Sequence, residues 1–157
     1  MSKMNRRQFN KSLVALSGVG AGVSLGLLPL SVFAAWPAGA FDAETTDAVA
    51  NALYGTAGAE TSDAITIKAP DIAENGAVVP VSVKADIANA DSVALLVANN
   101  PAPLAATFEM AAPGSIDVGT RIKMGKTSQL VALVRADGKL YSATSKEVKV
   151  TIGGCGG

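Results

Sequence analysis

The most reactive side chain of this sequence stands almost at its end, in the run Gly153-Gly154-Cys155-Gly156-Gly157. Cys155 is the single cysteine of the chain, so it has no partner for an internal disulfide. A lone cysteine is usually a small buried hydrophobe. Here the four neighbouring glycines offer no side chains to pack and cost the most entropy to order, and chain ends fray unless something holds them. We therefore expect Cys155 to be exposed on a flexible arm formed by these glycines.

The rest of the chain lacks the partners that would make this thiol a catalyst. There is no histidine, which excludes Ser-His-Asp and Cys-His catalysis and imidazole metal sites. The nearest basic residue in the sequence is Lys149, and nothing close to Cys155 could act as its general base. We therefore do not expect an autonomous enzyme, and we expect no metal or cofactor. An exposed thiol in an oxidising compartment nevertheless needs a functional reason.

Two other sequence features carry no catalytic prediction. The triplet Gly125-Lys126-Thr127 looks like the end of a phosphate-binding loop, but Thr120 stands where that loop requires a glycine. Five carboxylates of the body show no spacing that would force two of them together, so we expect them on a solvated surface. They are Asp71, Glu74, Asp86, Asp91 and Glu109.

The formal net charge of zero hides an asymmetry along the chain. Four of the 13 basic residues precede residue 12, whereas the first acidic residue is Asp42. Residues 12–157 contain nine basic and 13 acidic residues. This balance lacks the basic footprint that binding to a phosphate backbone requires, so nucleic acid is not expected as a partner.

The N-terminal segment of the chain is organised like an export signal. Residues 12–41 carry no charge and follow a basic cluster in which Arg6 and Arg7 resemble a twin-arginine signal. We expect residues 1–40 to be a cleaved signal peptide, with small residues permitting cleavage after Ala34, Ala35 or Ala40, and a periplasmic product without a stable membrane anchor. A retained anchor is the alternative, because about 20 apolar residues can span a bilayer.

A short helix is expected directly after this N-terminal segment. Asp42 would cap it, its last residue would be near Leu53, and Gly55 would stop it.

The sequence after this helix predicts a series of short strands. Apolar residues alternate at Val79, Val81 and Val83, and similar patterns follow at 93–97, 104–110, 118–124 and 148–152. Pro80 suggests an edge position, residues 130–135 suit a central strand, and Asp137-Gly138 predicts a hairpin to residues 140–144. About seven strands at this spacing predict an all-β fold, an immunoglobulin-like antiparallel β-sandwich of residues 41–152 with a short N-terminal helix and the flexible arm 153–157.

The ending Val150-Thr151-Ile152-Gly153-Gly154-Cys155-Gly156-Gly157 resembles that of the SoxY family, the sulfur-carrier subunits of the bacterial thiosulfate-oxidising Sox complex. The resemblance implies a periplasmic heterodimer with SoxZ and thiosulfate-derived sulfur, held as a sulfur or thiosulfonate group on Cys155. It also implies transient visits to SoxAX, SoxB and, where present, SoxCD. Three extended residues beyond Ile152 would carry the sulfur roughly 10 Å out, far enough to enter a recessed active site.

Two other functions fit part of the pattern. A ubiquitin-like carrier would hold sulfur on the carboxyl group of Gly157, but adenylation needs cytoplasmic nucleotide and leaves Cys155 without a purpose. A structural module would use Cys155 only to cross-link two copies as a disulfide homodimer. Sulfur adducts on Cys155 separate the carrier from both.

Overall fold

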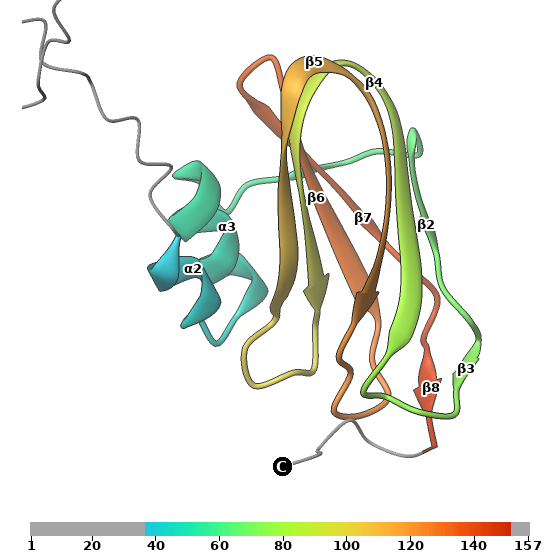
Figure 1. The fold of residues 1–157 in the computed structure, drawn as a ribbon. Coiled ribbons are helices and arrows are strands. Elements are labelled where there is room, and N and C mark those ends of the chain that lie inside the picture. Colours follow the sequence, from blue (N-terminus) through green and yellow to red (C-terminus); the bar gives the residue numbers. More distant parts are fainter. Residues whose placement is uncertain (1–36, 152–157) are drawn as a thin grey trace, which may run out of the picture. The chain divides into compact units, whose positions relative to one another are not determined.

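The computed structural model describes residues 37–151 of the chain, and Figure 1 shows their arrangement. Most of the elements are strands. In chain order they are α2 (Ala38–Phe41), α3 (Thr46–Tyr54), β1 (Glu60–Thr61), β2 (Ile65–Lys68), β3 (Ile72–Ala73), β4 (Val79–Val97), β5 (Leu104–Ile122), β6 (Leu130–Ala136), β7 (Lys139–Thr144) and β8 (Lys149–Val150).

One long, bent hairpin organises the sheet. Strands β4 and β5 pair antiparallel along most of their length, with register shifts between Ala85 and Ala90, where Asn89 has a φ of 56°. Such irregularities bend a strand without ending it. On the side of β4 opposite β5, β2 pairs with residues 82–85 and β6 pairs with residues 90–97. The strand order is β1-β7-β6-β4-β2, with β5 beside β4. Figure 1 shows β4 and β5 as the long hairpin.

The bend gives the sheet two layers. We call layer A the strand β2 with residues 79–85 of β4 and 116–122 of β5, and layer B the strands β1, β7 and β6 with residues 90–97 of β4 and 104–109 of β5. Buried apolar side chains from both layers form one cluster, and its members include Val81 and Val83 from layer A and Leu95 and Val134 from layer B. The core therefore lies between the two layers.

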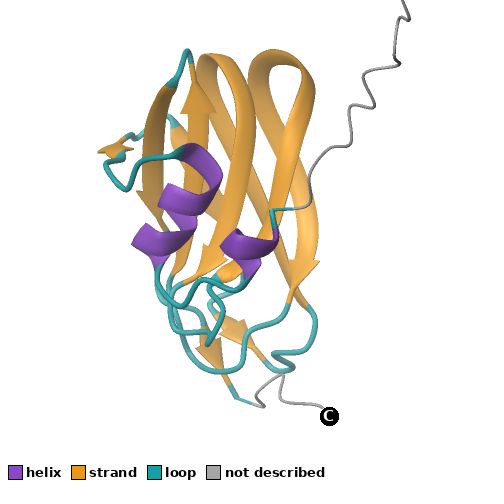
Figure 2. Cartoon of the chain, turned by 90° about the vertical axis from the view of Figure 1, so that its left-hand side faces the viewer, coloured by secondary structure: helices purple, strands orange, loops and turns teal. Residues whose placement is uncertain are grey.

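The two helices cover the outer face of layer B (Figure 2). Val49 and Ala50 of α3 and Ala40 of α2 are buried in a second cluster with Leu96 of β4 and Leu133 of β6. The backbone N–H of Ala48 donates to the Thr45 side chain, which caps α3, and Gly55 ends it at a left-handed φ of 72°. The predicted stop at Gly55 is confirmed.

The predicted helix start is wrong. Asp42 is the C-cap of the short helix α2, and Thr45 provides the N-cap of α3. Two short helices replace the single expected one because Ala40 of α2 is itself buried against layer B.

Several strand predictions are confirmed. Val79, Val81 and Val83 are all buried, and β6 is central, between β7 and β4. Asp137 and Gly138 form the turn between β6 and β7, with φ angles of 50° and 73°. Pro80 belongs to a strand with neighbours on both sides, but β2 ends opposite Ser82, so the position of Pro80 is open on that side.

The predicted arrangement of two antiparallel sheets is corrected in two respects. The two layers belong to one hydrogen-bonded sheet, because the strands expected at 79–84 and 93–97 are parts of β4, and β5 contains the strand expected at 104–110 and residues 118–122 of the one expected at 118–124. Two pairings are also parallel, β1 with β7 and β3 with β8. The mostly β architecture is confirmed, and its topology is a mixed, curled sheet.

Candidate functional site

The residues on which the sequence analysis places the chemistry lie outside the described part of the chain. Its last described residue is Thr151, so the structure positions the strand from which the C-terminal arm departs. The predicted residues outside the described range are Arg6 and Arg7 of the export signal, Cys155, and the arm glycines Gly153, Gly154, Gly156 and Gly157.

Residues 148–151, which we call the arm root, are held to the domain by backbone hydrogen bonds. The N–H of Lys149 donates to the carbonyl of Asp71 over 3.0 Å, and that of Thr151 donates to the carbonyl of Ala73 over 3.1 Å. The hydroxyl of Thr151 donates to the carbonyl of Glu74 over 3.2 Å. The chain is thus tied to the fold up to the last described residue.

A polar network fixes the other side of the arm root. Ser128 and Val148 exchange two backbone hydrogen bonds of 3.1 and 2.9 Å, and Val148 is buried. The N–H of Val150 donates to the hydroxyl of Thr127 over 3.0 Å. Thr127 therefore has a structural role in a triplet that merely looks like part of a phosphate loop.

This network extends to the loop after β4. The side chain of Asn99 donates to the carbonyl of Thr127 over 3.0 Å, and that of Asn100 donates to the carbonyl of Lys123 over 2.9 Å. This support of the arm root was not predicted from the sequence. Two polar pairs could have indicated it, Asn99-Asn100 shortly after β4 and Thr127-Ser128 shortly before β6. The sequence alone does not show that the two pairs meet.

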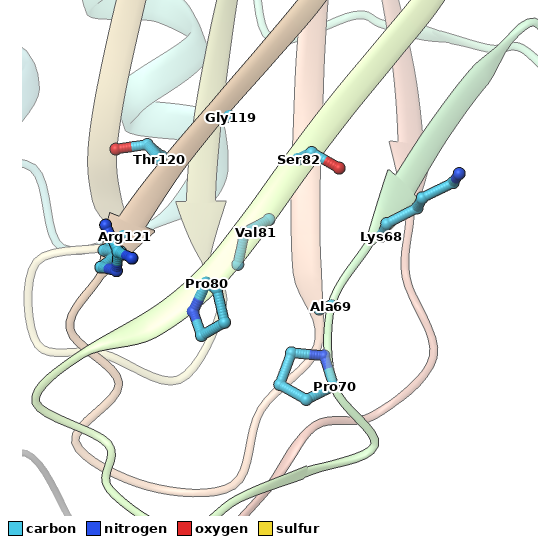
Figure 3. A pocket seen from close by; sticks show the side chains of 9 residues that line it. All are labelled: Lys68, Ala69, Pro70, Pro80, Val81, Ser82, Gly119, Thr120 and Arg121. Atoms are coloured by element: carbon cyan, nitrogen blue, oxygen red, sulfur yellow. The ribbon is translucent and has the colours of Figure 1, made fainter.

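A shallow groove of about 540 Å³ lies on the outer face of layer A (Figure 3). Pro70 and Pro80 line the groove where the chain after β2 separates from β4. The side chains of Lys68 on β2 and Arg121 on β5 also belong to the lining. Gly119 contributes no side chain to the lining. Within residues 37–151, neither Lys68 nor Arg121 makes an ion pair.

Two of the five carboxylates that were expected on a solvated surface meet around one cation. Asp91 accepts a hydrogen bond of 2.7 Å from Nε of Arg135, and Glu109 lies 3.3 Å from another guanidinium nitrogen. The hydrogen bond to Asp91 raises the pKa of Arg135. With a permanent cation between them, these carboxylates form a structural ion-pair cluster rather than an acid/base pair.

The same guanidinium group joins the sheet to α3. Its carbon lies 5.7 Å from the centre of the Tyr54 ring, within the range of a cation–π interaction. The Tyr54 hydroxyl and that of Ser92 are both buried, and neither has a partner in hydrogen-bond geometry among the described residues. Burial raises the pKa of Tyr54, and the nearby Ser92 hydroxyl opposes part of that rise. This contact between helix and sheet was not predicted.

Residues 37–151 contain no group of three or more metal-ligating side chains that could hold an ion. No helix in that range is long and apolar enough to cross a membrane.

Comparisons with known proteins bear on this fold. A family model described as "SoxY: Sulfur oxidation protein SoxY" matches residues 50–155, more than half of the chain. A solved structure, described as "Structure of the sulfur carrier protein SoxY from Chlorobium limicola f thiosulfatophilum", is 41% identical, with a TM-score of 0.58. The match covers 71% of this chain and 96% of the other. No curated protein matches the chain. The present chain belongs to the SoxY family of sulfur oxidation proteins.

Proposed function

We propose that this protein is a periplasmic sulfur carrier that holds thiosulfate-derived sulfur on Cys155 and presents it to the enzymes of the Sox system. The observation that carries the proposal is the sequence Gly-Gly-Cys-Gly-Gly, whose cysteine is included in the family match at residues 50–155. The related Chlorobium protein, 41% identical to this chain, is described as a sulfur carrier.

The arrangement of the arm root supports this role. Thr151 is fixed by hydrogen bonds, and covalent geometry allows the Cα atom of Cys155 to lie at most about 14 Å from it. Glycine neighbours would keep such a tether thin and adaptable. One anchored domain could then present its thiol to several differently shaped active sites.

In this proposal a different partner enzyme catalyses each successive step of the chemistry. In the first step the Cys155 thiol loses its proton, two electrons leave to the haem enzyme SoxAX, and a sulfur–sulfur bond joins Cys155 to thiosulfate. In the next step water attacks the terminal sulfonate under catalysis by SoxB, which releases sulfate and two protons and leaves a persulfide on Cys155. SoxCD, where present, oxidises the remaining sulfur. In each step this protein is the substrate platform.

Export by the twin-arginine route and heterodimer formation with SoxZ complete the proposal. Burial of Ala40 within α2 favours cleavage after Ala34 or Ala35, because a cut after Ala40 would remove most of a helix that packs on layer B. N-terminal sequencing of the exported protein tests this point. A first residue at Phe41 would contradict it.

The central experiment is intact-mass analysis of the mature protein and its copurified partner after incubation with thiosulfate and SoxAX. We expect a sulfur-containing adduct on the wild type and none on Cys155→Ser. Because the chain has one cysteine, loss of the adduct assigns it to that residue.

The Ser variant should keep the circular dichroism spectrum, melting temperature and partner binding of the wild type. Thiosulfate oxidation supported by Cys155→Ser would refute the carrier proposal. Sulfur found on the carboxyl group of Gly157 would favour a ubiquitin-like mechanism, and disulfide dimers without any adduct would favour a cross-linking module.

A further inference from the structure

We propose that the end of the domain beside the arm root is a docking surface for a client enzyme whose active-site entrance is rimmed by carboxylates. This proposal rests on the carrier function proposed above. We call the residues that form it the docking surface: Lys68, Pro70, Ile72, Val78, Pro80 and Arg121.

The first observation is that the groove on layer A is connected to the arm root through a second hollow in the surface. The groove on layer A shares Lys68, Ala69 and Pro70 with a second hollow of about 300 Å³. That second hollow extends to Val148, the first residue of the arm root. A protein that receives the arm therefore meets this concave surface next to the place where the arm leaves the domain.

The second observation is the position of exposed apolar side chains. Within residues 37–151, the large hydrophobic residues that stand out from the surface are Ile72, 56% exposed, and Val78, 53% exposed. Ile72 lies in β3, which pairs with β8 of the arm root, and Val78 directly precedes β4. Both flank the groove in sequence, two residues from Pro70 and Pro80 respectively. Apolar side chains of this kind gain free energy when a partner covers them.

The third observation is the distribution of charge. Six of the nine basic residues of the described domain lie at this end, on the ends of β2 and β5, in the arm root itself or in the loops beside it, together with three of the 13 acidic residues. The end thus has an excess of three positive charges, whereas the rest of the described domain has an excess of seven negative charges. The basic residues are Lys68, Arg121, Lys123, Lys126, Lys146 and Lys149, and the acidic ones are Asp71, Glu74 and Glu147.

These features fit a transient acidic client better than the other possible occupants. Permanent interfaces are large, apolar and poor in charge at their centre, whereas this surface combines two prominent apolar side chains with exposed cations. A second copy in a symmetric dimer would bring two positively charged ends together, which is unfavourable. An acidic rim would instead be attracted over a distance and then cover Ile72 and Val78.

The test measures steady-state loading of the mature carrier, with its copurified partner, by SoxAX at increasing salt concentration. Lys68→Glu and Arg121→Glu, alone and together, should raise KM, and the double variant should do so by about tenfold or more at low salt, with kcat unchanged. Salt should weaken the wild type's loading and reduce the difference between the proteins. Lys139→Glu is the matched control, since it reverses an exposed charge at the turn between β6 and β7 and should leave KM unchanged.

A second readout separates docking from the reactivity of the thiol. Alkylation of Cys155 by iodoacetamide should proceed at the same rate in all variants, because the small reagent needs no docking surface. A wild-type KM in the double variant, or an equal effect of Lys139→Glu, would overturn the docking proposal while leaving the carrier function intact. Loss of the copurified partner or of a homodimer in Arg121→Glu would also overturn it, by assigning the surface to that interface. A wild type that SoxAX cannot load at all would remove the carrier function and the docking proposal together.

Discussion

The two outer faces of the bent sheet differ in what covers them. On layer B, α2 and α3 bury Leu96, Leu133 and Leu140. On layer A, in the described part of the chain, Lys84 and Asp117 remain exposed at corresponding positions on β4 and β5. The helices therefore stabilise one face, while the other keeps a concave, charged surface available beside the arm root.

The burial pattern along β4 shows the same difference between the two layers. Burial alternates over residues 79–85, where one face packs on the core and the other meets solvent, but residues 92–97 are all buried. A strand covered on both faces loses its two-residue period. The change of pattern within one strand therefore marks the place where coverage by the helices begins.

The largest expected effect comes from a cavity beneath the helices. Leu96→Ala removes a fully buried side chain from the contact between layer B and α3. We expect the free energy of unfolding to fall by about 2 to 5 kcal/mol, the usual range for leucine truncation in a packed core. Urea unfolding of the mature protein measures it.

The control for this variant is Thr66→Ala on the open face, which removes an exposed side chain from β2. Its free energy of unfolding should stay within about 0.5 kcal/mol of the wild type. Equal losses in the two variants would show that the faces do not differ in their contribution to stability.

A smaller effect is expected from the ion pairs of the two faces. Arg135→Met on layer B breaks the hydrogen bond to Asp91 and the contact with Tyr54, and should cost about 1 kcal/mol because the pair is about one-third exposed. Lys84→Met on layer A breaks the exposed pair with Asp117 and should change stability by less than about 0.5 kcal/mol. Thermal and urea unfolding of both variants give the comparison.

High salt should diminish the difference between these two variants only partly, since the cation–π contact and the packing of the Arg135 stem do not depend on ionic screening alone. A Lys84→Met variant that is destabilised as strongly as Arg135→Met would contradict the distinction between the faces.

Local signals in the sequence predicted the local features of the fold. The left-handed Gly55, the turn at Asp137 and Gly138, and the alternating valines of β4 each depend on neighbouring residues and were recognised. The continuity of β4 was missed because its polar stretch around Asn89 resembles a loop. Pairing with β5 resumes beyond this stretch, and only the tertiary structure shows that the chain bends there without ending the strand.

The same distinction applies to the candidate site. The Gly-Gly-Cys-Gly-Gly sequence is contiguous, so its proposed chemistry could be inferred from the sequence. The arm root and the groove are assembled from distant segments, with Thr127 holding Val150 and Lys68 lying across the groove from Arg121. No spacing rule connects such pairs, because the bend of the hairpin brings them together.

The last prediction concerns the buried Tyr54 hydroxyl, where no loss is expected at neutral pH. The hydroxyl has no hydrogen-bond partner among the described residues. Tyr54→Phe therefore removes a buried polar group whose lost hydration is not compensated by a hydrogen bond in the folded protein. We expect the free energy of unfolding at pH 7 to be equal to or slightly above that of the wild type, as measured by urea unfolding.

A difference should emerge at alkaline pH. Burial raises the pKa of Tyr54 in the folded state, so above a pH of about 10 the unfolded chain releases a proton that the folded protein retains. The unfolded state then binds fewer protons, and the stability of the wild type must fall as pH rises. Tyr54→Phe lacks this contribution and should lose stability less steeply than the wild type. Parallel curves for wild type and Tyr54→Phe would mean that the hydroxyl reaches water in the folded state, and that the helices cover layer B less completely than its buried leucines indicate.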